Sequence, residues 1–390
     1  MSTAAILTLN VGSSSVKFAL FAADGSTRLA QGEATGLGGA ACLRTSRRGE
    51  PAVTQDLAAG SDAFGAIDAA LEWLDAACSD VSVAVVGHRI VHGGTRFVAP
   101  LAATAEVLQE LEALDPLAPK HQPFNIAGVR RVQARYPHSR AVACFDTAFH
   151  AGWDDATARL AIPRRFHDAG VRRYGFHGLS YEFLAARLGR DAPHARRAVL
   201  AHLGSGASLC ALRDGRSIDC TMGFSTLDGL PMATRSGTID PGVIFHLQRQ
   251  YGLGFDAIEH LLYDDSGLKG VSGRSGDMRE LLDAGDAAAN EAVALFVQRC
   301  VREIGAMVAV LGGVDALVFS GGIGAHAAPV RTAICARLGA FGVVLDAAGN
   351  QDGAGRISAP ASAVPVYAWA TDEEAVIAAH CAAWTSRGTL

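Results

Sequence analysis

Residues 10–17 (NVGSSSVK) gather small side chains and one lysine around an expected tight turn. Backbone N–H groups and hydroxyls in such a turn can wrap a phosphate, and the lysine can neutralise it. The segment is neither a Walker A loop nor a G-x-G-x-x-G loop, so by itself it fits an ordinary hairpin turn equally well. A second small-residue turn at residues 204–207 (GSGA) favours the phosphate interpretation, because two such turns could grip a polyphosphate from opposite sides.

Two arginines occupy positions where an anion could bind. Arg89 lies near the end of an apolar run, and an arginine at the carboxyl end of a strand in an α/β sheet can bind an anion in the crevice. Arg235 lies in a polar turn before an expected helix, with Asp240 as its N-cap and Pro241 in its first position. The planar guanidinium fork suits carboxylate or phosphate. The alternatives are a surface salt bridge for Arg89 and plain helix capping by Asp240.

Further polar side chains follow expected strands or precede an expected helix. Asp146 comes directly after the strand-like run AVACF, and His177 lies in YGFHG, a pattern typical of a histidine at a cleft wall. A lone histidine of this kind is more often structural, so its interest comes from Asp146 and the two arginines. The glycines of residues 320–324 (SGGIG) would let the backbone approach a base or phosphate closely. The carboxylates of residues 371–374 could bind a metal, although their default role is favourable charge at a helix N-terminus.

The hydrophobic patterns that surround these residues predict an α/β fold. Residues 6–21 and 198–212 each predict two strands joined by a small-residue turn. Residues 82–94 and residues 314–324 share a weaker similarity, because both are expected to be apolar strands that lead into glycine-rich turns. Helices are expected at 63–77 and, with apolar residues along one side, at 286–311. Two repeats of similar plan predict a duplicated fold of two lobes with a central cleft.

Composition excludes several classes of protein. With 49% hydrophobic and 19% charged residues in 390, the chain can bury a sizeable core. A net charge of −5 argues against a broad nucleic-acid surface but allows a local basic pocket. The N-terminus has no secretory pattern, and the most apolar stretch, residues 304–314, is too short to span a membrane. The 8 cysteines lack a C-x-x-C pair and are expected to be reduced, mostly buried thiols in a soluble cytoplasmic protein.

Ordered motifs from Ile6 to about His380 identify a family resemblance. The chain resembles the acetate kinase family (acetate and propionate kinases), which belongs to the superfamily of sugar kinases, actin and heat-shock ATPases. The motifs that carry the resemblance are LNVGSSSVKF, GHRIVHGG, FDTAFH, RYGFHGLS, TMGFSTLDGLPMATRSG, GDMREL and FSGGIG.

The resemblance implies a duplicated actin-like (ribonuclease H-like) α/β fold. One lobe would comprise residues 1–148 plus 375–390, and the other, residues 149–374, would hold the nucleotide site. It further implies a homodimer that transfers the terminal phosphoryl group of ATP directly and reversibly to acetate or another short carboxylate. The products would be ADP and an acyl phosphate, and the metal would be Mg²⁺ or Mn²⁺.

Site residues are also implied by the resemblance, motif by motif. Arg89 and Arg235 would bind the carboxylate and the transferring phosphoryl group, Asp146 would orient the attacking carboxylate, and His177 would stabilise the equatorial oxygens. A carboxylate nucleophile is already ionised at pH 7, so an orienting group suffices in place of a strong base. For the metal, the resemblance implies Asn10 and Glu373. For the acid, it implies Val91, His121 and Phe176 in addition to Arg89. The residues implied for the nucleotide are Ser13, Ser15, Lys17, His202, Gly204, Ser205, Gly206, Asp277, Met278, Arg279, Gly322, Ile323 and Gly324.

Several positions depart from the family's usual pattern, among them Thr238, Ala325 and His326, and three others bear directly on the proposed sites. Ser205 replaces an asparagine of the phosphate loop, and its shorter side chain would need water to make the same contact. Lys120 replaces an apolar residue of the acyl pocket, and Thr226 replaces a proline beside it. A buried ammonium is costly unless paired, so Lys120 either extends outward to solvent or, with Thr226, favours a functionalised carboxylate.

Three functions remain open on this evidence. The first is an acetate kinase, with propionate, butyrate or another carboxylate as the alternative acid, because one methylene changes specificity by only about 1–3 kcal/mol. The second is a sugar kinase on the same fold, against which the paired arginines argue. The third is a non-catalytic nucleotide-binding switch, which the change at Ser205 allows.

Overall fold

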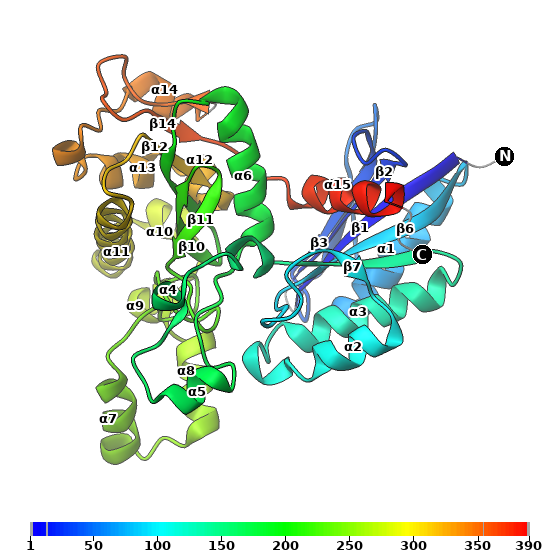
Figure 1. The fold of residues 1–390 in the computed structure, drawn as a ribbon, viewed down its shortest axis with the longest axis horizontal. Coiled ribbons are helices and arrows are strands. Elements are labelled where there is room, and N and C mark those ends of the chain that lie inside the picture. Colours follow the sequence, from blue (N-terminus) through cyan, green and yellow to red (C-terminus); the bar gives the residue numbers. More distant parts are fainter. Residues whose placement is uncertain (1–2, 13–14, 354, 388–390) are drawn as a thin grey trace. The chain divides into compact units, whose positions relative to one another are not determined.

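The computed structural model describes residues 3–12, 15–353 and 355–387, and it divides the chain into two compact units (Figure 1). Unit 1 comprises Met1–Phe149 and Asp372–Leu390, and unit 2 comprises His150–Thr371. The chain therefore leaves unit 1 once and returns to it for its last helix.

Unit 1 is built on a mixed sheet that, over the described residues, has eight strands in the order β5-β4-β3-β2-β1-β6-β8-β7. Strands β1 and β2 form the predicted hairpin, in which Asn10 lies opposite Lys17. Strand β6 runs parallel to β1, and β8 runs parallel to β6. The strands are β1 (Thr3–Val11), β2 (Ser15–Ala22), β3 (Arg28–Thr35), β4 (Cys42–Arg47), β5 (Val53–Asp56), β6 (Val81–Ile90), β7 (Leu101–Ala102) and β8 (Arg140–Phe145).

Helices cover both faces of this sheet. Helix α1 occupies the predicted range, Ala63–Ala77, because the Asp62 side chain caps it by accepting hydrogen bonds from two backbone N–H groups. Its residues Ile67 and Leu71 share a buried cluster with Val86 of β6. The next residue, Gly87, faces α15 instead, and a Cβ there would lie 2.4 Å from Ile377. The helices are α1, α2 (Ala105–Glu112), α3 (Gln122–Arg135) and α15 (Glu373–Ser386), with a 3-10 turn, η1 (Asp115–Leu117).

Unit 2 repeats the plan of unit 1 around a mixed sheet with the described strand order β11-β10-β9-β12-β14-β13. Strands β9 and β10 form the second predicted hairpin, and β12 runs parallel to β9 as β6 runs parallel to β1. The predicted duplicated α/β fold is therefore confirmed. The strands are β9 (Arg197–Leu203), β10 (Ala207–Arg213), β11 (Arg216–Cys220), β12 (Ala316–Ser320), β13 (Gly355–Arg356) and β14 (Val366–Ala368).

The glycine-rich segment after β12 corrects one expectation. Residues 320–324 were expected to form a turn, but helix α12 begins at Gly321. Gly321 adopts a φ of 75°, and a Cβ there would lie 2.5 Å from the carbonyl oxygen of Leu203. Only glycine allows the chain to pass this closely from strand to helix.

Helix α11 (Ala287–Leu311) is the longest helix of the described chain, and it begins one residue after the predicted start. Asp286 caps its first turn, and Gly312 ends it with a φ of 70°. The other helices of unit 2 are α4 (Asp155–Ala158), α5 (Arg164–Asp168), α6 (Gly178–Asp191), α7 (Pro241–Tyr251), α8 (Phe255–Asp264), α9 (Gly267–Ser272), α10 (Met278–Ala284), α12 (Gly321–His326), α13 (Ala328–Cys335) and α14 (Ala347–Asp352), with 3-10 turns η2 (Ala148–His150), which starts in unit 1, and η3 (Gly339–Phe341).

Two expectations from composition can be compared with the described residues. All eight cysteines are free thiols and seven of them are buried, as expected. Among the described helices, none combines the length and the apolar character that crossing a membrane requires.

Candidate active site

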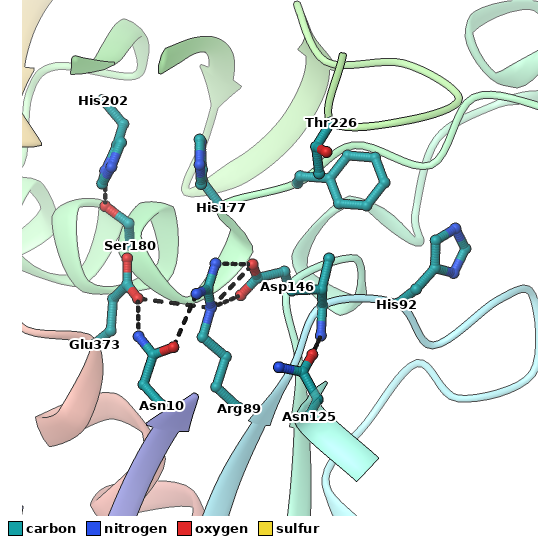
Figure 2. A network of polar contacts seen from close by, with 12 residues as sticks. Asn10, Arg89, His92, Asn125, Asp146, His177, Ser180, His202, Thr226 and Glu373 are labelled. Carbon is teal, nitrogen blue, oxygen red and sulfur yellow. Dashed lines mark hydrogen bonds and ion pairs between the residues drawn. The ribbon is translucent and has the colours of Figure 1, made fainter. Parts of the chain in front are cut away.

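Arg89 is the centre of a polar cluster in unit 1 that also contains Asn10, Asp146 and Glu373 (Figure 2). Strands β1, β6 and β8 are parallel neighbours, so their carboxyl ends meet at one edge of the sheet. Asn10 and Arg89 each lie one residue before the end of their strand, and Asp146 follows β8 directly. Glu373 reaches the same edge from the first turn of α15.

The contacts within this cluster are close. Arg89 donates from Nε to Asp146 Oδ1 at 3.0 Å and from Nη2 to Oδ2 at 2.5 Å. Its Nη1 donates to Asn10 Oδ1 at 3.0 Å, while Asn10 Nδ2 donates to Glu373 Oε2 at 3.4 Å. Glu373 Oε2 also lies 3.8 Å from Arg89 Nε. The Arg89 guanidinium thus contacts the carboxylates of Asp146 and Glu373 and the side-chain amide of Asn10.

The electrostatics keep Arg89 charged. Burial of the guanidinium lowers the pKa of Arg89, but the attraction of Asp146 and Glu373 outweighs this and raises the pKa above its ordinary value. The Asp146 side chain is only 1% exposed, whereas the Arg89 side chain is 18% exposed. Arg89 is therefore a permanent cation whose guanidinium is paired with two carboxylates.

Sequence reasoning missed Asn125 of α3, which joins two strand ends. The buried Asn125 accepts a hydrogen bond from Val91 N at 2.9 Å and donates to the Val11 carbonyl at 2.7 Å. Val91, predicted for the acyl site, is buried directly after β6, and His121 is the N-cap of α3. No local pattern distinguishes Asn125 from a helix-surface asparagine, because its partners lie far away in the sequence.

The predicted phosphate loop of unit 1 is described only in part. Lys17 lies on β2 and forms an ion pair with Glu33 at 3.4 Å. Burial would lower the pKa of Lys17, but Glu33 and the carboxylates at the start of α15 raise it. Ser15 begins β2, and Ser13 lies outside the described residues. Lys17 is thus a firmly charged group next to Asn10 in the sheet.

Unit 2 holds a second cluster, built on two stacked imidazoles. The rings of His177 and His202 stack with their centroids 4.4 Å apart. His177 Nδ1 lies 2.8 Å from Ser208 Oγ. His202 Nδ1 lies 2.8 Å from Ser180 Oγ (Figure 2). Tyr181 OH lies 2.5 Å from the same Ser208 oxygen. Each histidine is therefore held by a serine hydroxyl at Nδ1.

His177 has an unusual backbone conformation. It is the N-cap of α6 and has φ 57° and ψ 27°, in the left-handed region that non-glycine residues rarely adopt. Such strain costs about 1–3 kcal/mol and gathers at functional sites. Among the described non-glycine residues, Asp214 shares a positive φ, and the sequence contained no signal for this conformation at His177.

Gly206 lies where the predicted phosphate-binding groups of unit 2 converge. A Cβ at Gly206 would lie 3.2 Å from His177 Nε2 and 3.9 Å from Arg235 Nη1. Ser205 accepts a backbone hydrogen bond from Ala233. A Cβ at Gly204 would lie 3.7 Å from the backbone nitrogen of Gly322. The β9–β10 turn therefore lies beside the histidine, the arginine and the start of α12.

The remaining predicted nucleotide residues lie on two short helices. Asp277 caps α10, and its carboxylate pairs with Arg279 at 2.7 Å, which lowers the pKa of Asp277. Met278 is buried in the first turn of α10. Ile323 and Gly324 belong to α12, where the buried Arg331 donates to the Gly324 carbonyl. Phe176, predicted for the acid, is fully buried directly before His177.

His150 supports this region as a neutral imidazole. Its Nε2 lies 2.9 Å from the Phe176 carbonyl and must donate to it, so Nδ1 accepts from Ser217 Oγ at 2.7 Å. Trp153 Nε1 donates to the same hydroxyl at 2.9 Å. Burial lowers the pKa of His150 to about 4, because water cannot solvate the charged imidazolium there.

Acid is expected to destabilise the protein through such histidines. Because the pKa of folded His150 lies below its unfolded value, the unfolded state binds more protons as the pH falls from about 6.5 to about 4. Stability present above pH 6.5 is lost across this window, by about 3 kcal/mol for His150. Urea denaturation at several pH values measures this, and His150→Gln should make the slope shallower. A free energy of unfolding that stays constant between pH 7 and 4.5 would contradict the assignment.

Asn10 and Glu373 offer the oxygen ligands that Mg²⁺ prefers. In nucleotide sites this ion is held by one or two carboxylates together with phosphates and water. Across the described ranges, no group of three or more His, Cys, Asp or Glu side chains could hold a metal ion. The two residues therefore fit an ion that a nucleotide helps to hold, and they do not form an all-protein cage.

Comparison with known proteins identifies the family of this chain. The Acetokinase family matches residues 5–379. The acetate kinase of Methylocella silvestris is 45% identical over 395 residues and covers 96% of each chain, and that of Rhizobium meliloti is 46% identical and covers 98% of each. A propionate kinase from Francisella tularensis has a TM-score of 0.90 at 34% identity, covering 97% of this chain and 99% of that one. The acetate kinase of Porphyromonas gingivalis has a TM-score of 0.84 at 36% identity, covering 96% and 98%. With a match that spans nearly all of its residues, this chain belongs to the acetokinase family.

Proposed function

We propose that this protein is an acetate kinase, which transfers the γ-phosphoryl group of ATP reversibly to acetate and yields acetyl phosphate and ADP. The family and its acetate kinase relatives support this reaction. The observation that carries the proposal furthest is the cluster in which Arg89 binds Asp146 and Asn10 beside Glu373. Propionate is the alternative acid, because a similar solved structure is that of a propionate kinase.

The reaction needs positioning and charge neutralisation more than proton transfer. An acetate oxygen attacks the γ-phosphorus in line, the bond to the β–γ bridging oxygen breaks, and ADP leaves with that electron pair. In our proposal Arg89 and Arg235 neutralise the carboxylate and the transferring group, and Asp146 orients the acetate. The acid is already ionised, so no base has to remove a proton.

His177 is proposed to donate a hydrogen bond to the transferring phosphoryl group. Burial raises the pKa of Tyr181 far above its ordinary value, so its hydroxyl stays protonated and can donate to Ser208 Oγ. In our proposal Ser208 then donates to His177 Nδ1, which leaves the ring proton on Nε2, the atom that lies 3.2 Å from a Cβ built at Gly206. A donor aimed where charge develops is worth about 10²–10³ in rate.

The nucleotide is proposed to contact both small-residue turns. Lys17, Ser13, Ser15, His202, Gly204, Ser205 and Gly206 would bind phosphates, and Asp277, Met278, Arg279, Gly322, Ile323 and Gly324 would contact the adenosine. Asn10 and Glu373 would hold Mg²⁺, with Mn²⁺ as the alternative. The bound ion would neutralise phosphate charge as the transferring group moves.

Trapping of acyl phosphate with hydroxylamine tests this function. With ATP and Mg²⁺, we expect strong turnover of acetate or propionate and little ATP hydrolysis when no carboxylate is present. Omission of ATP is the control for chemical background. ATP binding without turnover of any acid would overturn the proposal and favour a nucleotide-binding switch.

The acid preference is predicted to depend on Lys120 and Thr226. Thr226 is buried, and its carbonyl accepts from Arg235 Nη1 at 3.1 Å, whereas Lys120 is partly exposed. We expect Lys120→Leu to lower the kcat/KM ratio of hydroxy acids over acetate by about 10-fold, because a hydroxyl loses its polar neighbour. The measurement is kcat/KM over acetate, propionate, butyrate and their hydroxy acids. An unchanged ratio would show that Lys120 only extends to solvent.

A homodimer and a cytoplasmic location complete the proposal. None of the residues of α7 is buried, and Phe245, Tyr251 and Phe255 are 54%, 69% and 75% exposed. Exposed apolar side chains of this size, close together in the sequence, are typical of a protein interface. Sedimentation velocity should give about twice the mass of one chain.

A further inference from the structure

The start of α15 is held by an ion pair outside the motifs and outside the cluster around Arg89. Arg28, the first residue of β3, donates from Nη2 to both oxygens of Asp372 at 2.5 and 2.6 Å. Its Nη1 donates to Gln31 Oε1 at 2.6 Å, and the guanidinium lies over the ring of Phe21, with Arg28 Cζ 5.1 Å from the ring centroid. Contacts on three sides therefore fix the orientation of this guanidinium.

Asp372 also caps the N-terminus of α15. Its Oδ1 accepts a hydrogen bond from Ala375 N at 3.0 Å. The same carboxylate thus joins the first turn of α15 to the sheet through Arg28. Because Glu373 is the next residue, the contact between Arg28 and Asp372 also constrains its position.

The contacts that the Glu373 carboxylate makes are long, so they hold its position only weakly. Its Oε2 lies 3.4 Å from Asn10 Nδ2 and 3.8 Å from Arg89 Nε, near the upper limits for a hydrogen bond and an ion pair. Helix ends fray, and the chain re-enters unit 1 at Asp372. Something other than Glu373 itself must therefore hold this turn in place.

The ion pair is poorly suited to a purely stabilising role. The side chains of Arg28 and Asp372 are each 32% exposed. At this partial exposure, water and salt screen part of the attraction, which reduces what the pair contributes to the free energy of folding. The ion pair therefore matters more for the position of the first turn of α15 than for the free energy of folding.

We propose that Arg28 is a positioning residue for Glu373. Arg28 holds Asp372, and through it the first turn of α15, so that the Glu373 carboxylate stays beside Asn10. The proposal rests on the metal role given to Asn10 and Glu373 in the proposed function. Arg28 itself contacts neither the substrates nor the metal ion.

Arg28→Gln and Asp372→Asn test this in the full-length protein. Asparagine caps a helix as well as aspartate does, so Asp372→Asn removes the ion pair and keeps the cap. We expect each variant to raise the dissociation constant of Mn²⁺ from the enzyme–ADP complex by about 10-fold, as for residues that orient metal ligands. Electron paramagnetic resonance of free Mn²⁺ measures this. The double variant should bind no more weakly than either single one, because both break one contact.

Two control variants separate positioning from general destabilisation. Arg196→Gln removes another exposed arginine–aspartate pair, in which Arg196 donates to Asp214 at 2.5 and 2.9 Å, and it should leave Mn²⁺ binding unchanged. Arg28→Lys keeps the charge and should recover part of the affinity. In kinetics, the Mg²⁺ concentration for half-maximal activity should rise for Arg28→Gln, while kcat at saturating Mg²⁺ stays near the wild-type value.

Equal Mn²⁺ binding by Arg28→Gln and the wild type would overturn the proposal. A parallel loss of ADP binding without metal would also overturn it, since that loss reports a structural defect. Failure of the proposed function looks different, because the wild type would then bind Mn²⁺ with ADP but form no acyl phosphate from any acid. The positioning role would still be tested by the metal titration in that case.

Discussion

Arg89→Ala is expected to lower kcat for acetyl phosphate formation by at least about 10³-fold, the worth of a cationic arginine in phosphoryl transfer. The variant removes the charge that would meet the substrates and the donor that holds Asn10. It also leaves the Asp146 side chain, 1% exposed, without its arginine partner. Breaking a buried pair in this way costs about 3–5 kcal/mol of stability. Initial rates at saturating substrates and a urea unfolding curve measure the two effects.

Two further variants separate these effects on activity and stability. Arg89→Lys retains a charge but not the fork that meets both Asp146 oxygens, so it should fold well and remain slow. A double variant, Arg89→Met with Asp146→Leu, removes both charges and should recover stability without activity. A kcat within tenfold of wild type in Arg89→Ala would refute the role of this arginine.

Arg331→Met should have a large effect on stability. Arg331 is 1% exposed, and burial lowers the pKa of its guanidinium. It donates to the carbonyls of Gly324, Ala325 and Asn350 at 3.0, 2.8 and 2.5 Å, and to Asn350 Oδ1 at 2.8 Å. Methionine fills similar space but donates nothing. Since each buried acceptor left unsatisfied costs about 1–3 kcal/mol, we expect a loss of about 4 kcal/mol in the free energy of unfolding.

The loss should extend to nucleotide binding. Arg331 holds the end of α12, whose first turns contain Gly322 and Ile323 of the proposed adenosine site. ADP affinity, measured by calorimetry at a temperature where the variant is folded, should therefore fall as well. Arg337→Met, at an exposed position of the same region, is the matched control and should change stability by less than about 0.5 kcal/mol. Identical urea midpoints for Arg331→Met and the wild type would show that the carbonyls find other donors.

Local patterns predicted those parts of the fold whose causes are local. Helix α1 matches its predicted range because Asp62 and the apolar spacing both act within a few residues. Both hairpins were predictable from alternation around small residues. Arg89 and Asp146 stood out because strand ends in an α/β sheet gather ligand-binding groups. The roles themselves came from the family resemblance and stay predictions.

Features set by distant contacts were not predictable. Asn125 bonds to Val11, 114 residues away, and Arg28 bonds to Asp372, 344 residues away. The left-handed conformation of His177 follows from its packing and has no signature in YGFHG. The turn expected at residues 320–324 became a helix because the close passage of Gly321 by Leu203 is visible only once the sheet is formed.

The repeated strand plan places different side-chain chemistries at matching positions of the two units. The strand registers place Asn10 and His202 at equivalent points of the two hairpins, and Lys17 likewise matches Ser208. By the same registers, the place of Arg89 on β6 matches that of Ser320 on β12. One copy thus carries charges where the other carries an imidazole and hydroxyls. The same strand plan thus presents a different set of polar groups in each unit.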